Sequence, residues 1–132
     1  MRRPLGIALV TALAGCGATH HDPPDPRCTQ PATIMRVAGG GSGPLISVCV
    51  RRATNDVDLQ DVGSAISSAA DVLAARHQPR ALGFLIGATR RGTGTSGVQA
   101  ELVNRVEAVA RRMKSADDST VRQGIADGEA HG

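Results

Sequence analysis

Three cysteines carry the most reactive side chains in this sequence, and no other set of residues forms a recognisable catalytic group. A thiol can carry a lipid, pair with another thiol, or act as a nucleophile beside a base. His77 and His131 lie at a predicted helix end and in the tail, and no Gly-x-Ser-x-Gly elbow is present. The acidic residues occupy predicted caps and exposed faces. We therefore expect no enzymatic activity and no cofactor.

The amino terminus has the pattern of an export signal. Arg2 and Arg3 precede an uncharged run of ten residues, 5–14, with the sequence LGIALVTALA. A transmembrane helix needs about 20 apolar residues, so this run is too short to span a bilayer. A basic start followed by a short apolar run is typical of a secretory signal peptide.

The export signal ends in Leu13-Ala14-Gly15-Cys16, which resembles the lipobox of bacterial lipoproteins at all four positions. The resemblance implies that acyl chains such as palmitate are attached at Cys16 and that the signal peptide, 1–15, is removed. Two or three acyl chains hold a protein stably on a membrane, whereas one holds it marginally. The predicted location is the cell envelope outside the cytosol, on the outer membrane or the cell membrane. An ordinary secretory leader or a cytosolic start is the alternative.

A flexible tether is predicted over 16–32, because this segment is polar, rich in proline and without periodicity. His20, His21 and Asp22 lie in the tether and are potential metal ligands. Adjacent histidines in a flexible segment, without further ligands at fixed spacing, seldom form a metal site. We therefore predict no bound metal.

Cys28 and Cys49 remain once Cys16 is assigned to the lipid, and an even pair in an exported chain suggests a disulfide. The bond would close a loop of about 20 residues and stabilise the fold by about 3 kcal/mol. The predicted strand pairing opposes it, since position 49 would face 33 rather than 28. The alternative is a buried free Cys49 and an exposed Cys28.

Charge and composition argue against a nucleic-acid partner. The chain has 132 residues, a formal net charge of +3, 41% hydrophobic residues and 1% aromatic residues. Removal of Arg2 and Arg3 leaves 13 basic residues against 12 acidic ones, or +1. Such a chain offers neither a strong electrostatic footprint nor stacking platforms for bases. Its length suits a single domain.

The remainder of the chain, 33–132, is predicted to form this domain from strands and helices. Apolar runs predict four strands, at 33–37, 45–52, 80–89 and, weakly, 120–125. The run at 80–89 is apolar on both faces and should be the most central element. Apolar residues at helical spacing predict helices over 55–76 and 97–114, with a close packing contact at Gly63. The predicted fold is α+β, a small mixed sheet with two helices on one face.

This order of elements resembles the OmpA-like domain, the peptidoglycan-binding module of peptidoglycan-associated lipoproteins, over residues 45–132. Four short motifs carry the resemblance: Leu59-x-x-x-Gly63, Gly87-Ala88-Thr89-Arg90, Arg105 and Gly128-Glu129. In that family an Asp and an Arg bind the charged ends of diaminopimelate in the peptidoglycan stem. The resemblance implies an OmpA-like core over 45–128, with β-α-β-α-β order after an extra N-terminal strand.

Thr89, Arg90 and Arg105 are the positions that the resemblance assigns to ligand binding. Arg90 stands where the family has Asp, which reverses the sign of the charge, and Val98 and Glu101 also depart from the family pattern. Two interpretations of Arg105 therefore stay open. It either contacts a ligand or lies on a solvated helix face, paired with Glu101.

A glycine-rich segment follows the third predicted strand. Gly92-x-Gly94-x-x-Gly97 matches a dinucleotide fingerprint, but no strong parallel strand comes after it. Arg90, Arg91 and the glycine amides before a helix instead predict an anion site, with a flexible turn as the alternative.

Two functions are consistent with these patterns. The first is a non-enzymatic envelope lipoprotein whose OmpA-like domain contacts peptidoglycan or an envelope protein. The second is a lipid-anchored accessory or inhibitory subunit without peptidoglycan binding. It would act through a protein interface on the helix at 97–114 or the strand at 33–37. An inert gene product is a third interpretation.

Overall fold

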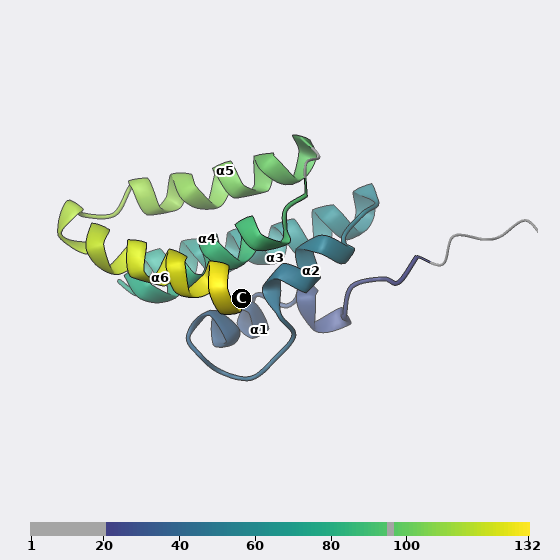
Figure 1. Ribbon diagram of the computed structural model, residues 1–132, viewed down its shortest axis with the longest axis horizontal. Helices are drawn as coiled ribbons and strands as arrows, with labels where there is room; N and C mark the ends of the chain where they lie inside the picture. The colour runs from purple at the N-terminus through teal and green to yellow at the C-terminus, as the bar shows by residue number, and fades with distance from the viewer. Residues whose placement is uncertain (1–20, 95–96) are drawn as a thin grey trace, which may run out of the picture.

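The computed structural model describes residues 21–94 and 97–132, and this part of the chain consists of helices joined by turns and loops. It contains six α-helices, two 3-10 turns and no strand. In chain order the elements are η1 (Pro26–Thr29), α1 (Pro31–Ala38), α2 (Ile46–Arg52), α3 (Asp56–Ala75), α4 (Pro79–Gly92), α5 (Gly97–Arg111), η2 (Ser115–Asp117) and α6 (Asp118–His131) (Figure 1). The predicted α+β fold with a small mixed sheet is therefore wrong.

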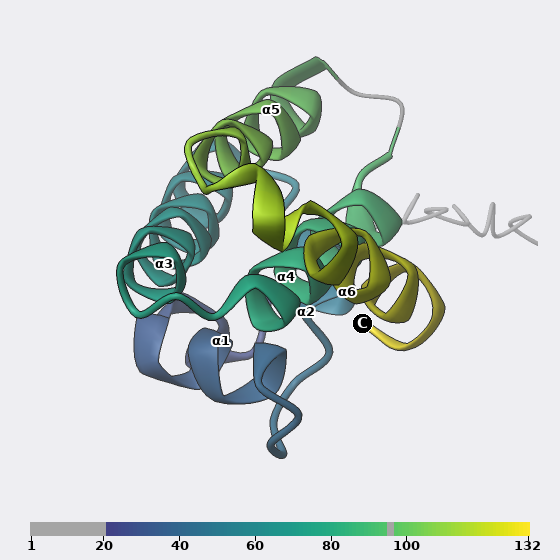
Figure 2. The same ribbon diagram turned by 90° about the vertical axis from the view of Figure 1, so that its left-hand side faces the viewer.

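Helix α4 lies at the centre of the molecule. It contacts each of the other five α-helices, and Figure 2 shows α3, α5 and α6 arranged around it. Leu82, Leu85 and Ile86 on this helix are buried. The apolar run at 80–89 is thus the central element, as predicted, but it forms a helix instead of a strand. A helix that is apolar around its circumference belongs in an interior just as a buried strand does.

The glycines of α4 and α6 explain why the run at 80–89 packs as a helix. Gly83 and Gly87 lie one turn apart on α4, and Gly124 and Gly128 have the same spacing on α6. A Cβ atom on Gly87 would lie 2.7 Å from the backbone nitrogen of Glu129, a distance that real Cβ atoms do not show. The two backbones are therefore in direct contact, which only glycine permits here. The weak strand predicted at 120–125 is part of α6.

The other two predicted strands are short helices. The segment at 33–37 belongs to α1, which buries Ile34 and Val37. The segment at 45–52 overlaps α2, which buries Ile46, Cys49 and Val50 at helical spacing. Runs of five to eight residues fit either periodicity, and long-range packing selects between them.

The two helices predicted from periodicity are present. The helix predicted over 55–76 is α3, and its Asn55 side chain accepts a hydrogen bond of 2.8 Å from the backbone N–H of Asp58. The helix predicted over 97–114 is α5, which ends at Arg111. None of the helices in the described part is long and apolar enough to cross a bilayer.

The segment predicted as a tether, 16–32, contains η1, which starts at Pro26 and buries Cys28. The OmpA-like fold implied for residues 45–128 is an α+β fold, and in this region the described residues form only helices. The predicted signal peptide, the predicted lipidation site Cys16 and the potential metal ligand His20 lie outside the described residues.

Candidate functional site

The Thr89 side chain is buried between the helices and hydrogen-bonded within α4. Its side chain is fully buried, and its hydroxyl donates a hydrogen bond of 2.7 Å to the backbone carbonyl of Leu85. A hydroxyl that is buried and already bonded is not positioned to contact a ligand.

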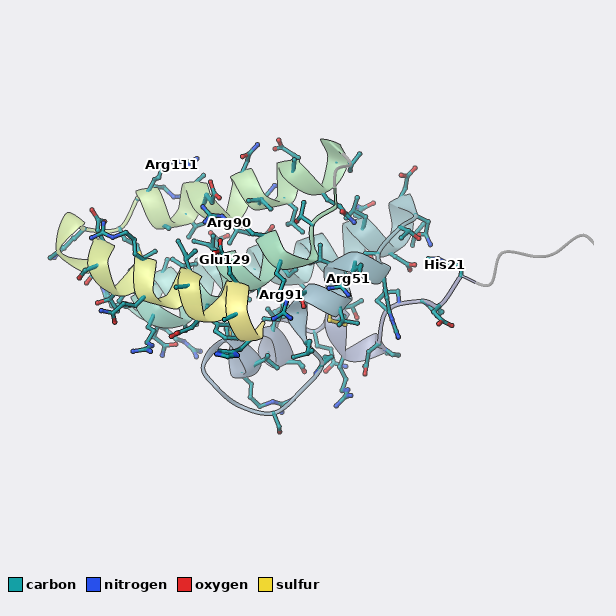
Figure 3. All side chains as sticks on the ribbon, viewed as in Figure 1. His21, Arg51, Arg90, Arg91, Arg111 and Glu129 are labelled. Atoms are coloured by element: carbon teal, nitrogen blue, oxygen red, sulfur yellow. A yellow bond between two sulfur atoms is a disulfide. The ribbon has the colours of Figure 1, made fainter. Side chains whose placement is uncertain are left out.

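Arg90 joins α4 to two other helices. Its Nε donates to Glu107 of α5 at 2.9 Å, and its Nη1 donates to Glu129 of α6 at 3.2 Å (Figure 3). The bond to Glu107, followed by that to Glu129, raises the pKa of Arg90. Next to it, Nη1 of Arg91 donates to the carbonyl of Ala130 at 2.6 Å. Both guanidinium groups predicted to bind an anion thus already have acceptors within the fold.

Arg105 lies elsewhere, in a groove between the amino-terminal halves of α3 and α5. The groove has a volume of about 250 Å³. Its floor is apolar, formed by Leu59, Gly63 and Leu102, and charged side chains lie around it. We call this groove the α3/α5 groove. The structure therefore does not bring Thr89, Arg90 and Arg105 into one site.

The charged side chains of the α3/α5 groove have no ion-pair partner among the described residues. They are Asp56, Glu101 and Arg105. The pair expected between Glu101 and Arg105 does not form, whereas the next pair of this spacing, Glu107 with Arg111, does so at 3.8 Å. At the mouth of the groove Val98 is 63% exposed. Leu45 and Val57 are also large exposed apolar side chains in the described part of the chain, but Val98 is the one that lines this groove beside unpaired charges.

Gly63 leaves space in the groove instead of making a tight contact. A Cβ atom there would lie 3.7 Å from Cδ1 of Leu102, which is an ordinary van der Waals distance. The close packing expected at Gly63 is found at the glycines of α4 and α6.

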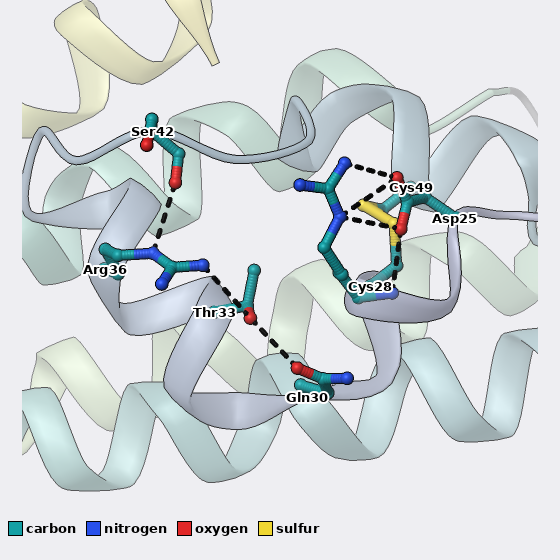
Figure 4. A network of polar contacts seen from close by, with 8 residues as sticks. Asp25, Cys28, Gln30, Thr33, Arg36, Ser42 and Cys49 are labelled. Atoms are coloured by element: carbon teal, nitrogen blue, oxygen red, sulfur yellow. Dashed lines mark hydrogen bonds and ion pairs between the residues drawn. A yellow bond between two sulfur atoms is a disulfide. The ribbon is translucent and has the colours of Figure 1, made fainter.

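Cys28 and Cys49 are joined in a disulfide, with their Cα atoms 5.6 Å apart (Figure 4). The opposition from strand pairing disappears because α2 replaces the predicted strand and places Cys49 beside Cys28 of η1. Beside the bond, the Arg27 side chain donates to Asp25 at 2.7 Å. This side-chain bond, with one from the Arg27 backbone, lowers the pKa of Asp25 to about 2.

His21 contacts the start of α3. Its Nε2 lies 3.1 Å from Oδ2 of Asp58, and its Nδ1 lies 3.0 Å from Oγ1 of Thr54. In the part of the chain that the structure describes, no group of three His, Cys, Asp or Glu side chains is arranged to hold a metal ion.

A second groove, which sequence reasoning missed, lies between the loop after α1, the start of α4, and α6. Its volume is about 740 Å³, and it contains Phe84, the single aromatic residue of the chain. Arg80 and Asp127 at its rim pair with each other at 2.7 Å. Residues from three distant segments form this groove, so no local sequence signal could have revealed it.

Comparisons with known proteins add no assignment to these sites. No family model matches the chain, and neither a curated protein nor a solved structure is similar to it at a significant level.

Proposed function

We propose that this protein is a lipid-anchored accessory subunit of the cell envelope that binds a protein partner through the α3/α5 groove. The observation that carries the proposal is Val98, which is 63% exposed at the mouth of an apolar groove. The Leu13-Ala14-Gly15-Cys16 motif supports anchoring, and the Cys28–Cys49 bond agrees with an oxidising compartment.

The size of the groove favours a protein partner over a small ligand. Ligand pockets usually measure about 300–1,000 Å³ and enclose most of the molecule they bind. A groove of about 250 Å³ has room for one or two apolar side chains from a partner surface. The partner would cover Val98 and supply charges to Glu101 and Arg105, which have no ion pair in the described part of the chain.

Peptidoglycan binding is not part of this proposal. The resemblance that implies peptidoglycan binding is to an α+β domain, whereas the described part of the chain contains helices and no strand. Of the three residues assigned to that ligand, Thr89 is buried and Arg90 is paired with Glu107 and Glu129.

Membrane anchoring is tested by growing cells with an alkyne-labelled fatty acid. The intact chain should take up the label and remain with membranes, and Cys16→Ala should abolish both. Full membrane retention of the unlabelled Cys16→Ala chain would contradict the anchor.

The interface is tested by placing a photo-crosslinking amino acid at Val98 in the native chain. We expect one discrete adduct with another envelope protein, and Arg105→Glu should reduce it because the groove loses its cation. The matched control carries the crosslinker at Gln123, an exposed position on α6. Equal adducts from both positions, or no effect of Arg105→Glu, would contradict the groove as the binding surface.

A further inference from the structure

The Cys28–Cys49 disulfide joins two short segments that dock on different parts of the bundle. η1 and α1 pack mainly on α3, whereas α2, which carries Cys49, packs mainly on α4. α1 has 8 residues and α2 has 7. Helices of this length are not stable in isolation, so both depend on being held against the bundle.

Polar contacts within the segment 25–42 do not hold it to the bundle. Arg27 bonds to Asp25, Thr33 bonds to Gln30, and Arg36 donates to the carbonyl of Ser42 (Figure 4). Each of these contacts joins two residues of the same segment. Attachment to the rest of the described chain therefore depends on buried apolar side chains and on the disulfide.

The buried apolar side chains are few. On α1 they are Ile34, Val37 and Ala38, and Met35 is partly buried against the same core. Burial of these four side chains has to offset the conformational entropy lost when more than ten residues become ordered. A glycine-rich loop, 39–44, connects α1 to α2 and adds to this cost. The disulfide removes much of this entropy cost, because it closes the loop covalently before the segment docks.

We propose that this disulfide is a latch: η1 and α1 dock on α3 only after Cys28 and Cys49 have been oxidised. Each thiol loses a proton and an electron. The two electrons reduce the disulfide of an oxidising dithiol protein, which leaves as a dithiol. Once η1 has docked, both cysteines are 1% exposed, so an attacking thiolate does not reach the sulfurs. The latch closes once, after export, and then persists.

The latch would set how far the bundle stands from its anchor, and this consequence rests on the proposed function. Cys16 lies five positions before His21, which contacts α3, and 29 positions before Leu45. At ~3.5 Å per extended residue, the maximum reach is about 18 Å with the latch closed and, once the His21 contacts with α3 are also lost, about 100 Å with it open. Oxidation would therefore bring the α3/α5 groove close to the membrane.

Hydrogen exchange of the full-length chain tests the latch, with the oxidised protein compared with a Cys28→Ala/Cys49→Ala chain. We expect amides in 31–38 to exchange about 100-fold faster in the double variant, while amides of α3 and α5 stay protected. Wild-type chain reduced by a phosphine before refolding should behave like the variant, which controls for the lost sulfur atoms. Trypsin should cut after Arg36 in the double variant and in the reduced wild-type chain, which both lack the disulfide, and not in the oxidised protein.

Two results would overturn the latch. In one, amides 31–38 stay equally protected without the bond, so docking does not need oxidation. In the other, all helices lose protection together, so α1 is part of one cooperative unit. Neither result depends on acylation, whereas fatty-acid labelling at Cys16 tests the anchor alone. Failure of the latch and failure of the proposed function are therefore distinguished.

Discussion

Gly83 of α4 lies directly against Gly124 of α6, and a Cβ atom built on either glycine would lie 3.0 Å from the Cα atom of the other. One turn further along each helix, Gly87 meets the backbone of Ile125 and Glu129, and Gly128 meets the backbone of Phe84 and Ala88. The central helix and the last helix are therefore packed backbone to backbone, without intervening side chains.

Replacing Gly83 with Ala should destabilise the protein by about 3 kcal/mol or more, because its new methyl group meets the backbone of α6 and not a side chain that could move. Denaturant unfolding followed by circular dichroism measures the change. Gly124→Ala should have an effect of similar size, since it inserts a methyl group into the same contact from the opposite helix. A cost below about 1 kcal/mol for both variants would show that α4 and α6 are not in this close contact.

Gly63→Ala should have the opposite effect and raise the free energy of unfolding. The new Cβ atom would lie 3.7 Å from Leu102, so it fits without displacement, and Ala is favoured over Gly inside a helix by about 1 kcal/mol. The same unfolding experiment should show a gain of this size. Because the methyl group partly fills the α3/α5 groove, the variant should also weaken the Val98 crosslink. A net loss of stability would mean that the groove is tighter than described.

The contact between Arg90 and Glu107 should contribute modestly to stability. The Arg90 side chain is 40% exposed, so water and salt screen the pair. A double-mutant cycle with Arg90→Met and Glu107→Gln should give a coupling free energy of about 0.5–1 kcal/mol at low salt. The coupling should decline at about 1 M salt. A coupling that is zero at low salt would show that the two side chains do not interact in solution.

Asp25 should titrate well below an ordinary aspartate. Bonds from Arg27 lower its pKa from 3.8 to about 2. A lowered pKa in the folded state means that the pair stabilises η1 above about pH 4 and that this contribution is lost as the pH falls toward 2. Carbon-13 NMR of the carboxyl group measures the midpoint, and Arg27→Ala should return it toward 3.8. An unshifted midpoint in the intact chain would exclude the pairing.

Helices α3 and α5 could be predicted from the sequence because the signals for them are local. On α3 the apolar residues recur at helical spacing from Leu59 to Leu73, and Asn55 supplies a cap within three residues of the N–H that it accepts from. Information of this kind does not require knowledge of the rest of the fold.

The α3/α5 groove could be predicted only in part. The family resemblance points to Arg105, and the helix at 97–114 is one of the two predicted surfaces for a protein interface. That Arg105 faces α3 across an apolar floor depends on how two helices pack, and the sequence contains no direct record of this. The pairing of Arg90 with Glu129, 39 residues away, could not be predicted from the sequence for the same reason.

By itself, the sequence determined the two long amphipathic helices, the central position of the run at 80–89 and the chemistry available to the cysteines. Only the tertiary structure decided that 80–89 is a helix, that 120–125 belongs to another, and that position 49 lies against 28. A short apolar run is compatible with strand or helix, and the contact that selects the helix comes from Gly124 and Gly128, about forty residues later in the chain. Local periodicity carries no information about a contact with a backbone segment that is remote in the sequence.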